Sequence, residues 1–272
     1  MDQLTYVANF HDDDAVKKMS YQPLGNTGLS VSRISLGGGP LGDMYGSNKE
    51  EEYIATVHLA LKSGINYIDT APWYGNDSNL NTLTALKDVP RSAYYIGTKV
   101  GRYEQDLEKQ FDFSGKRVEQ SVDASLKLLG LNYVDVIQVH DLEFAESLDI
   151  ILEETLPALQ KVVEQGKARH IGITGYPLHL LQEVIERSSI NIELVLSYAR
   201  NTLLDDTLKE FIPFFQNLDS VLTPPTPLEE KVALELKLKF FDPLPRKHWE
   251  GVGPAQYWKS LRQLRGELPQ DD

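Results

Sequence analysis

Four polar side chains with compatible chemistry follow three strand-like segments of this sequence. Asp69 ends the first segment and Tyr74 lies just beyond it, Lys99 lies near the end of the second, and His140 follows the third. A carboxylate, a phenol, an ammonium and an imidazole can together move a proton to or from an oxygen atom. Because a barrel of parallel strands brings the carboxyl ends of its strands to one rim, these four side chains are predicted to form an active site.

The proposed acid in this set is Tyr74. A free phenol has a pKa of about 10 and donates a proton poorly at neutral pH. An ammonium such as that of Lys99 favours phenolate and lowers this pKa, Asp69 would hold the ammonium in place, and His140 would orient a carbonyl oxygen. Such a site suits hydride transfer between a nicotinamide cofactor and a carbonyl carbon. Each of these residues alone could have a purely structural role, so the prediction rests on the occurrence of four compatible residue types on consecutive strands.

The order of elements along the chain indicates how these residues are positioned. Residues 1–18 form a polar leader, and residues 19–272 are expected to form a single domain. The GNTG turn between two alternating segments predicts a hairpin over residues 21–34. Six strand–helix pairs then follow between residues 30 and 215, with apolar strands typical of a parallel sheet covered by helices. Residues 76–90 are rich in Asn, Ser and Thr and predict only weak helix.

Two architectures fit this alternation of strands and helices. A doubly wound sheet would bind its ligand where the strand order reverses. A (β/α)8 TIM barrel would use the whole rim of strand ends. The leading hairpin, together with the lack of a G-x-G-x-x-G fingerprint after the first strand, favours the barrel.

Composition excludes several classes of function. The net charge of -13 argues against nucleic-acid and anionic-membrane partners, which need basic surfaces. The sequence has no cysteine, which excludes disulfides and thiol chemistry. No secretory signal or membrane-length apolar run is recognisable, so a cytoplasmic protein is expected. A metal-dependent lyase using Asp69, His140 and Asp141 is a weaker alternative, because Lys99 would repel a cation, and we expect no metal site.

Three motifs resemble those of the aldo-keto reductase superfamily: DTAPWYG, the lysine of GTKVGRY and the histidine of VIQVHD. The segments from GRYEQDL to VIQVHD and through GKARHIGITG are most similar to those of L-galactose dehydrogenase-like members. The resemblance covers about residues 20–215. It implies a (β/α)8 barrel with a hairpin at its base, NADP or NAD as cofactor, and a sugar or a small carbonyl or alcohol as substrate.

The resemblance also implies a role for each matching residue. Tyr74 becomes the proton donor and acceptor, Lys99 and Asp69 tune it, and His140 orients the substrate. The implied contacts to the cofactor are Gly38, Asp69, Thr174 and Ser197. The implied neighbours of the substrate are Tyr45, Trp73 and Asp141.

Residues 216–272 depart from the family pattern. Their Pro-rich and polar sequence lacks the last two strand–helix units and the cofactor loop of the relatives, so we expect these units to be missing or replaced. A six-strand arc would expose two sheet edges, through which the chain could form oligomers, and would bind the cofactor weakly. The alternative function is therefore a catalytically impaired barrel that acts as a binding or interaction protein.

Overall fold

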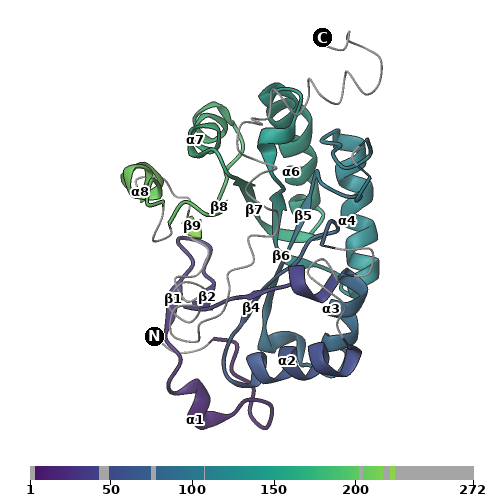
Figure 1. Ribbon diagram of the computed structural model, residues 1–272, viewed down its shortest axis with the longest axis vertical. Helices are drawn as coiled ribbons and strands as arrows, with labels where there is room; N and C mark the ends of the chain where they lie inside the picture. The colour runs from purple at the N-terminus through teal and green to yellow at the C-terminus, as the bar shows by residue number, and fades with distance from the viewer. Residues whose placement is uncertain are drawn as a thin grey trace, which may run out of the picture.

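The computed structural model describes residues 4–42, 49–74, 78–106, 108–201, 205–216 and 221–223. Its main sheet has seven parallel strands in the order β3-β4-β5-β6-β7-β8-β9, and it curls into an open arc (Figure 1). These strands are β3 (Leu36–Gly37), β4 (Tyr67–Asp69), β5 (Tyr95–Val100), β6 (Val134–Val139), β7 (Ala168–Gly175), β8 (Leu194–Ser197) and β9 (Val221–Thr223). Because the strand order follows the chain without reversal, the arc belongs to a (β/α)8 barrel, as predicted, and not to a doubly wound sheet.

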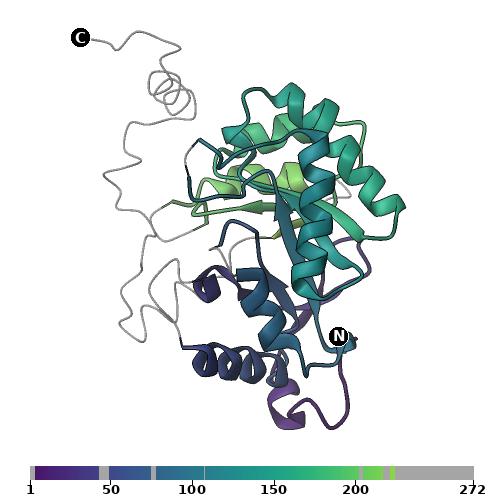
Figure 2. The same cartoon turned by 90° about the vertical axis from the view of Figure 1, so that its right-hand side faces the viewer.

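Helices cover the outer face of this arc, as the two perpendicular views show (Figures 1 and 2). No helix within the described ranges is both long and apolar enough to span a membrane. The α-helices after the first strand are α2 (Glu50–Lys62), α3 (Ser78–Leu86), α4 (Gly115–Leu129), α5 (Leu148–Ile150), α6 (Leu156–Glu164), α7 (Leu178–Arg187) and α8 (Leu208–Gln216). Shorter helical turns are η1 (Gly39–Gly42), η2 (Arg91–Ala93), η3 (Leu142–Phe144) and the π-helical η4 (Ile151–Thr155).

Helix α4 illustrates how local sequence sets the ends of these elements. Ser114 caps the first turn by accepting a hydrogen bond from the Arg117 amide at 3.4 Å. Gly130 ends the helix in the left-handed conformation, with φ of 63°, which glycine adopts without steric cost. Val118 and Val122, one helical turn apart, are both buried against the sheet. The cap, the glycine and the apolar stripe together place α4 on the outer face between β5 and β6.

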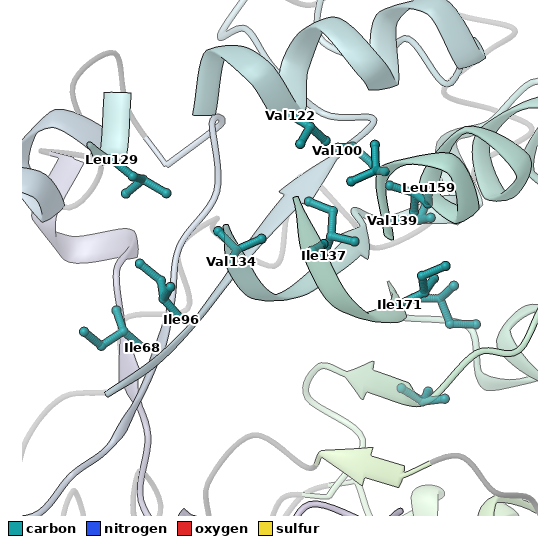
Figure 3. Close-up of a cluster of buried hydrophobic side chains, with 14 of the residues drawn as sticks. Ile68, Ile96, Val100, Val122, Leu129, Val134, Ile137, Val139, Leu159 and Ile171 are labelled. Carbon is teal, nitrogen blue, oxygen red and sulfur yellow. The ribbon is translucent and has the colours of Figure 1, made fainter. Parts of the chain in front are cut away.

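The main hydrophobic core lies between the sheet and the helices (Figure 3). Ile96 on β5 and Ile137 on β6 are fully buried there, and Val122 on α4 and Leu159 on α6 approach them from the helical layer. Burial of each such side chain contributes roughly 1.5–3 kcal/mol. This core holds the strands in fixed register and so fixes the positions of their carboxyl ends.

The predicted hairpin closes the opposite, amino-terminal end of the barrel. Strands β1 (Tyr21–Pro23) and β2 (Ser30–Ser32) pair antiparallel around the GNTG turn. Leu24, Leu29 and Val31 of this hairpin form a second buried cluster with side chains from β4, β6 and β8. Apolar side chains of the described residues therefore fill the base of the barrel, and the opposite rim, at the carboxyl ends of the strands, is where a site is expected.

Part of the segment expected to be a polar leader packs against the base of the barrel. Its helix α1 (Asp13–Val16) is capped by Asp12, whose amide donates to the Lys62 carbonyl at the end of α2. Asn66 donates to the Thr5 hydroxyl at 3.0 Å in a buried position. Residues 4–18 are thus tied to the elements that precede β4.

Helix α3 corrects the expectation of weak helix after β4. It runs for nine residues, Ser78–Leu86, despite its Asn and Thr content. Ala85 and Leu86 are buried, and α3 packs between α2 and α4. Tertiary packing therefore outweighs low intrinsic propensity, as it does for most helices in proteins.

Strand β9 corrects the expectation of a six-strand arc. It pairs parallel with β8, with Leu194 opposite Val221, and so adds a seventh strand to the sheet. The strand was missed because its three residues give too short an apolar run to be distinguished from a loop. Residues 217–220 and 224–272 of the atypical segment lie outside the described residues.

Candidate active site

Strands β4, β5 and β6 bring the predicted catalytic residues together inside the carboxyl-terminal rim. Asp69 pairs with Gly97, and Lys99 pairs with Gln138, so these positions share one face of the sheet. Ile68, Ile96 and Ile137 alternate with them and face the outer core. The period of two along each strand therefore turns the polar residues to the interior of the barrel and the apolar residues to the helices.

The ammonium of Lys99 is the centre of the site. It is 1% exposed, and it donates to Asp69 Oδ2, to the Tyr74 hydroxyl at 2.9 Å and to the Thr70 carbonyl at 3.1 Å. The Tyr74 hydroxyl also lies 3.4 Å from Asp69 Oδ2. An ammonium has three protons to donate, and all three are used here. The phenol, the ammonium and the carboxylate therefore form one connected hydrogen-bond network.

Gln138 completes this network and was not identified from the sequence. Its Nε2 donates to Asp69 Oδ1 at 2.9 Å, so both carboxylate oxygens of Asp69 are held. Gln138 lies on β6, two residues before His140, and is 1% exposed. The sequence did carry a signal for this residue. Gln138 is a polar residue in a mostly apolar strand, two positions before the candidate catalytic residue His140.

His140 packs edge-on against Tyr74, with ring centroids 5.6 Å apart. Burial lowers the pKa of His140 to about 3; the negative charge of Asp141 opposes this shift, and the positive charges of Lys99 and Arg102 reinforce it. The ring is therefore neutral at physiological pH. A neutral imidazole in this position can form a hydrogen bond to an oxygen atom bound next to the phenol, but it does not serve as a proton reservoir.

A second ion pair lies directly beside this network. Arg102 Nη1 contacts Asp141 Oδ2 at 2.6 Å, and its guanidinium carbon lies 3.2 Å from the centroid of the Trp73 indole ring. Asp141 Oδ2 is also 3.7 Å from His140 Nε2. Burial opposes ionisation of Asp141, but the combined effect of its neighbours His140, Arg102 and Lys99, with the hydrogen bond from Arg102, outweighs burial and lowers the pKa of Asp141. Asp141 and Trp73 were predicted from the sequence, whereas Arg102 was missed although it follows Lys99 by three residues.

The backbone of Asp141 is held in an unusual conformation. Its φ is 51°, in the left-handed region that few residues other than glycine adopt. The amide of Asp141 donates to the Thr174 hydroxyl at 2.9 Å. Thr174, on β7, is thereby linked to the loop that carries His140 and Asp141.

The other residues predicted to form the site are Gly38, Ser197 and Tyr45, and they differ in their position relative to the catalytic residues. The Gly38 amide donates to the Asp69 carbonyl at 2.7 Å, and a Cβ at Gly38 would lie 2.9 Å from that oxygen, so only glycine fits. Ser197 pairs with Gly175 and follows Val195 by two residues, which places its side chain on the helix-covered face and apart from the catalytic set. Tyr45 lies outside the described residues.

The sequence model of the Aldo/keto reductase family matches residues 33–265. The chain belongs to this family. The match continues beyond residue 215, where the resemblance of the motifs ends, and so includes much of the segment regarded as atypical. An aldo-keto reductase from Bacillus halodurans has a similar structure, with a TM-score of 0.67 and 28% identity, covering 93% of this chain and 78% of that one.

Two curated family members are close in sequence. L-galactose dehydrogenase from Arabidopsis thaliana is 44% identical over 204 residues, which are 74% of this chain and 62% of that protein. D-arabinose 1-dehydrogenase from Saccharomyces cerevisiae is 33% identical over 192 residues, which are 67% of this chain and 56% of that protein. The chain thus spans less than two thirds of the length of these relatives.

Proposed function

We propose that this chain is an NAD(P)-dependent oxidoreductase that transfers a hydride between the cofactor and a sugar or a small carbonyl or alcohol. Tyr74 is the proposed proton donor and acceptor. The observation that most supports this proposal is the Tyr74 hydroxyl 2.9 Å from the buried Lys99 ammonium. Membership of the aldo/keto reductase family supports the cofactor class, and the names of the two sugar dehydrogenases support the substrate class.

In the proposed reaction, the proton and the hydride of the substrate are transferred to different acceptors. During oxidation of an alcohol, the hydroxyl proton passes to the Tyr74 oxygen while the hydrogen on carbon leaves as a hydride; reduction reverses both transfers. When bound, the nicotinamide ring accepts or supplies that hydride. Lys99 stabilises the phenolate form of Tyr74, because its ammonium donates directly to the phenol oxygen. Neutral His140 donates a hydrogen bond to the reacting oxygen and so fixes its position.

We propose that the nicotinamide end of the cofactor binds beside this network. Thr174 accepts the Asp141 amide proton and keeps its own hydroxyl proton for a ligand acceptor such as a carboxamide oxygen. We propose Thr174 as the carboxamide contact, with Gly38, Asp69 and Ser197 as further contacts. Ser197 would contribute through its backbone, since its side chain shares a face with Val195.

The substrate would bind above the same network. Trp73 packs against His140 with ring centroids 6.2 Å apart, and Asp141 follows His140 directly. Both residues therefore border the position of the reacting oxygen. We propose that they contact the substrate, together with Tyr45.

Replacement of Lys99 by Met tests the proposal. The variant keeps the length of the side chain but removes the ammonium that stabilises phenolate, so kcat is expected to fall by about 10²-fold or more. The rate is followed by the absorbance of reduced nicotinamide with L-galactose and either cofactor. Lys167→Met, which removes a surface partner of Asp123, serves as the matched control and should retain the parent rate. An unchanged kcat in folded Lys99→Met would overturn the proton-transfer role.

A second candidate function is a barrel that binds ligands without turnover. It is favoured by the sequence of residues 216–272, which departs from the motifs of the family. Fluorescence titration with NADPH and NADH separates the two candidates. Binding followed by substrate oxidation supports the enzyme, whereas a folded chain that gives no turnover, whether or not it binds a nucleotide, supports the non-catalytic barrel.

A further inference from the structure

The Arg102–Asp141 ion pair takes no part in the proton transfer proposed for Tyr74, yet it lies within the same site. Asp141 Oδ2 is 3.7 Å from Nε2 of His140, the ring that the proposed function places against the reacting oxygen. The side chains of Arg102 and Asp141 are 11% and 20% exposed, so the pair is largely shielded but still reachable from the rim. A substrate held between Tyr74 and His140 must therefore contact this pair.

Arg102 and Asp141, together with the neighbouring Trp73, form a cluster in which several polar atoms have unused hydrogen-bonding capacity. Arg102 Nε and Trp73 Nε1 are buried, and neither finds a hydrogen-bond partner among the described residues. Within those residues, the hydrogen bond to the Asp141 carboxylate from Arg102 goes to Oδ2, which leaves Oδ1 as an acceptor. Buried polar atoms without partners are costly, and a ligand that pairs with them gains that free energy on binding. The cluster thus offers both donors and an acceptor to a bound molecule.

The charges of the site cancel in pairs. The Lys99 ammonium is balanced by Asp69, the Arg102 guanidinium is balanced by Asp141, and His140 is neutral. Within the described part of the site, an anionic substrate would meet the Asp141 carboxylate, and both nearby cations, Lys99 and Arg102, already have carboxylate partners. An apolar carbonyl compound would cover the ion pair without replacing its lost hydration. Both classes are therefore disfavoured.

We propose that Arg102 and Asp141 act together as the specificity-determining pair, selecting uncharged polyhydroxylated substrates. Asp141 accepts a hydrogen bond from a hydroxyl on the carbon next to the reacting carbon. Arg102 cancels the charge of that carboxylate and donates to a second substrate oxygen, while Trp73 holds the guanidinium plane in place. This inference rests on the proposed function, since it places the reacting oxygen between Tyr74 and His140.

The test measures how substrate preference changes in Asp141→Asn. The variant keeps the size of the side chain but loses the negative charge, which leaves Arg102 without its carboxylate. Three substrates are compared by kcat/KM. L-galactose and D-galacturonate are assayed for oxidation with the oxidised nicotinamide cofactor, and benzaldehyde is assayed for reduction with the reduced cofactor. The ratio for galactose over benzaldehyde is expected to fall by about 10- to 100-fold, and the ratio for galacturonate over galactose to rise by a similar factor.

Two further variants control for structural effects. Asp123→Asn neutralises a carboxylate that pairs with Lys167 far from the rim, and it should leave both ratios unchanged. The double variant Arg102→Gln/Asp141→Asn is compared with its two single variants by kcat/KM for L-galactose. The loss in the double variant, expressed as a free energy, should be smaller than the sum of the two single losses, because each single change breaks the same ion pair. Equal losses on all three substrates in Asp141→Asn would assign the pair a structural role and overturn the proposal.

Sugar binding provides a readout that does not depend on turnover. Tryptophan fluorescence is titrated with L-galactose in the parent chain and in Asp141→Asn, and the variant is expected to bind at least 10-fold more weakly. Equal affinity in the two proteins, or no binding to the parent, contradicts the specificity role. Failure of the proposed function looks different: sugar binding persists and depends on Asp141, but neither the parent nor Tyr74→Phe turns the sugar over.

Discussion

Replacement of Tyr74 by Phe is expected to lower kcat by about 10³-fold while the chain stays folded. The change removes one oxygen atom, which accepts a hydrogen bond from Lys99 at 2.9 Å and lies 3.4 Å from Asp69 Oδ2. Without it, the substrate proton has no acceptor next to the ammonium. The aromatic ring and its edge-on contact with His140 are kept, so binding of the substrate should change far less than kcat.

Steady-state rates with L-galactose and with its analogue deuterated at the reacting carbon check this expectation. Tyr133→Phe is the matched control, because Tyr133 lies between Arg91 and Arg169 near the base of the barrel. It should retain the parent rate. If Tyr74→Phe turns over as fast as the parent, another group moves the proton, and the proposed role of the whole network fails.

The second large effect is expected from Glu143, a buried carboxyl in the turn that follows His140 and Asp141. Its Oε1 accepts the Tyr176 amide proton at 2.9 Å, while its Oε2 is buried without a hydrogen-bond partner in the described part of the chain. A Cβ at Gly175 would lie 2.8 Å from Oε2, so the glycine leaves room for the carboxyl. Burial, reinforced by the negative charge of Asp141, raises the pKa of Glu143 to about 8.

This pKa makes the free energy of unfolding depend on pH. The unfolded chain releases the Glu143 proton near the ordinary pKa of about 4.3, whereas the folded chain keeps it until about pH 8. Between these values the folded state binds more protons, so its stability falls as the pH rises, and above about pH 8 the loss is complete. The loss attributable to Glu143 is on the order of 5 kcal/mol.

Glu143→Gln is expected to remove this loss. Glutamine has the shape of the neutral acid and can still accept the Tyr176 amide proton. Urea unfolding should therefore give similar stability for parent and variant at about pH 5, and a more stable variant at about pH 9. Exposed Glu146→Gln controls for the general effect of removing a carboxylate. A parent–variant difference that does not change between the two pH values would show that Glu143 is already ionised in the folded protein.

The sequence was informative where local pattern and topology agree. Polar residues at the ends of apolar strands predicted Asp69, Lys99 and His140, because parallel strands of a barrel end at one rim. The order β4, β5, β6 in the sheet confirms that these strands are neighbours. The hairpin at the base also followed from local turn chemistry and alternation.

Features that depend on tertiary packing could not be predicted from the sequence. Gln138 and Arg102 gain their roles only through partners 69 and 39 residues away, Asp69 and Asp141. Helix α3 forms because its neighbours bury it, against the preference of its own residues. The raised pKa of Glu143 arises from burial, which no motif reveals.

The proposed proton-transfer groups Asp69, Tyr74, Lys99 and His140 all come from three consecutive strand–helix units. The proposed cofactor contacts Thr174 and Ser197 lie on the later strands β7 and β8. A substitution on those strands would therefore alter the proposed binding of the nucleotide, while the sequence of the proposed reacting groups stays unchanged.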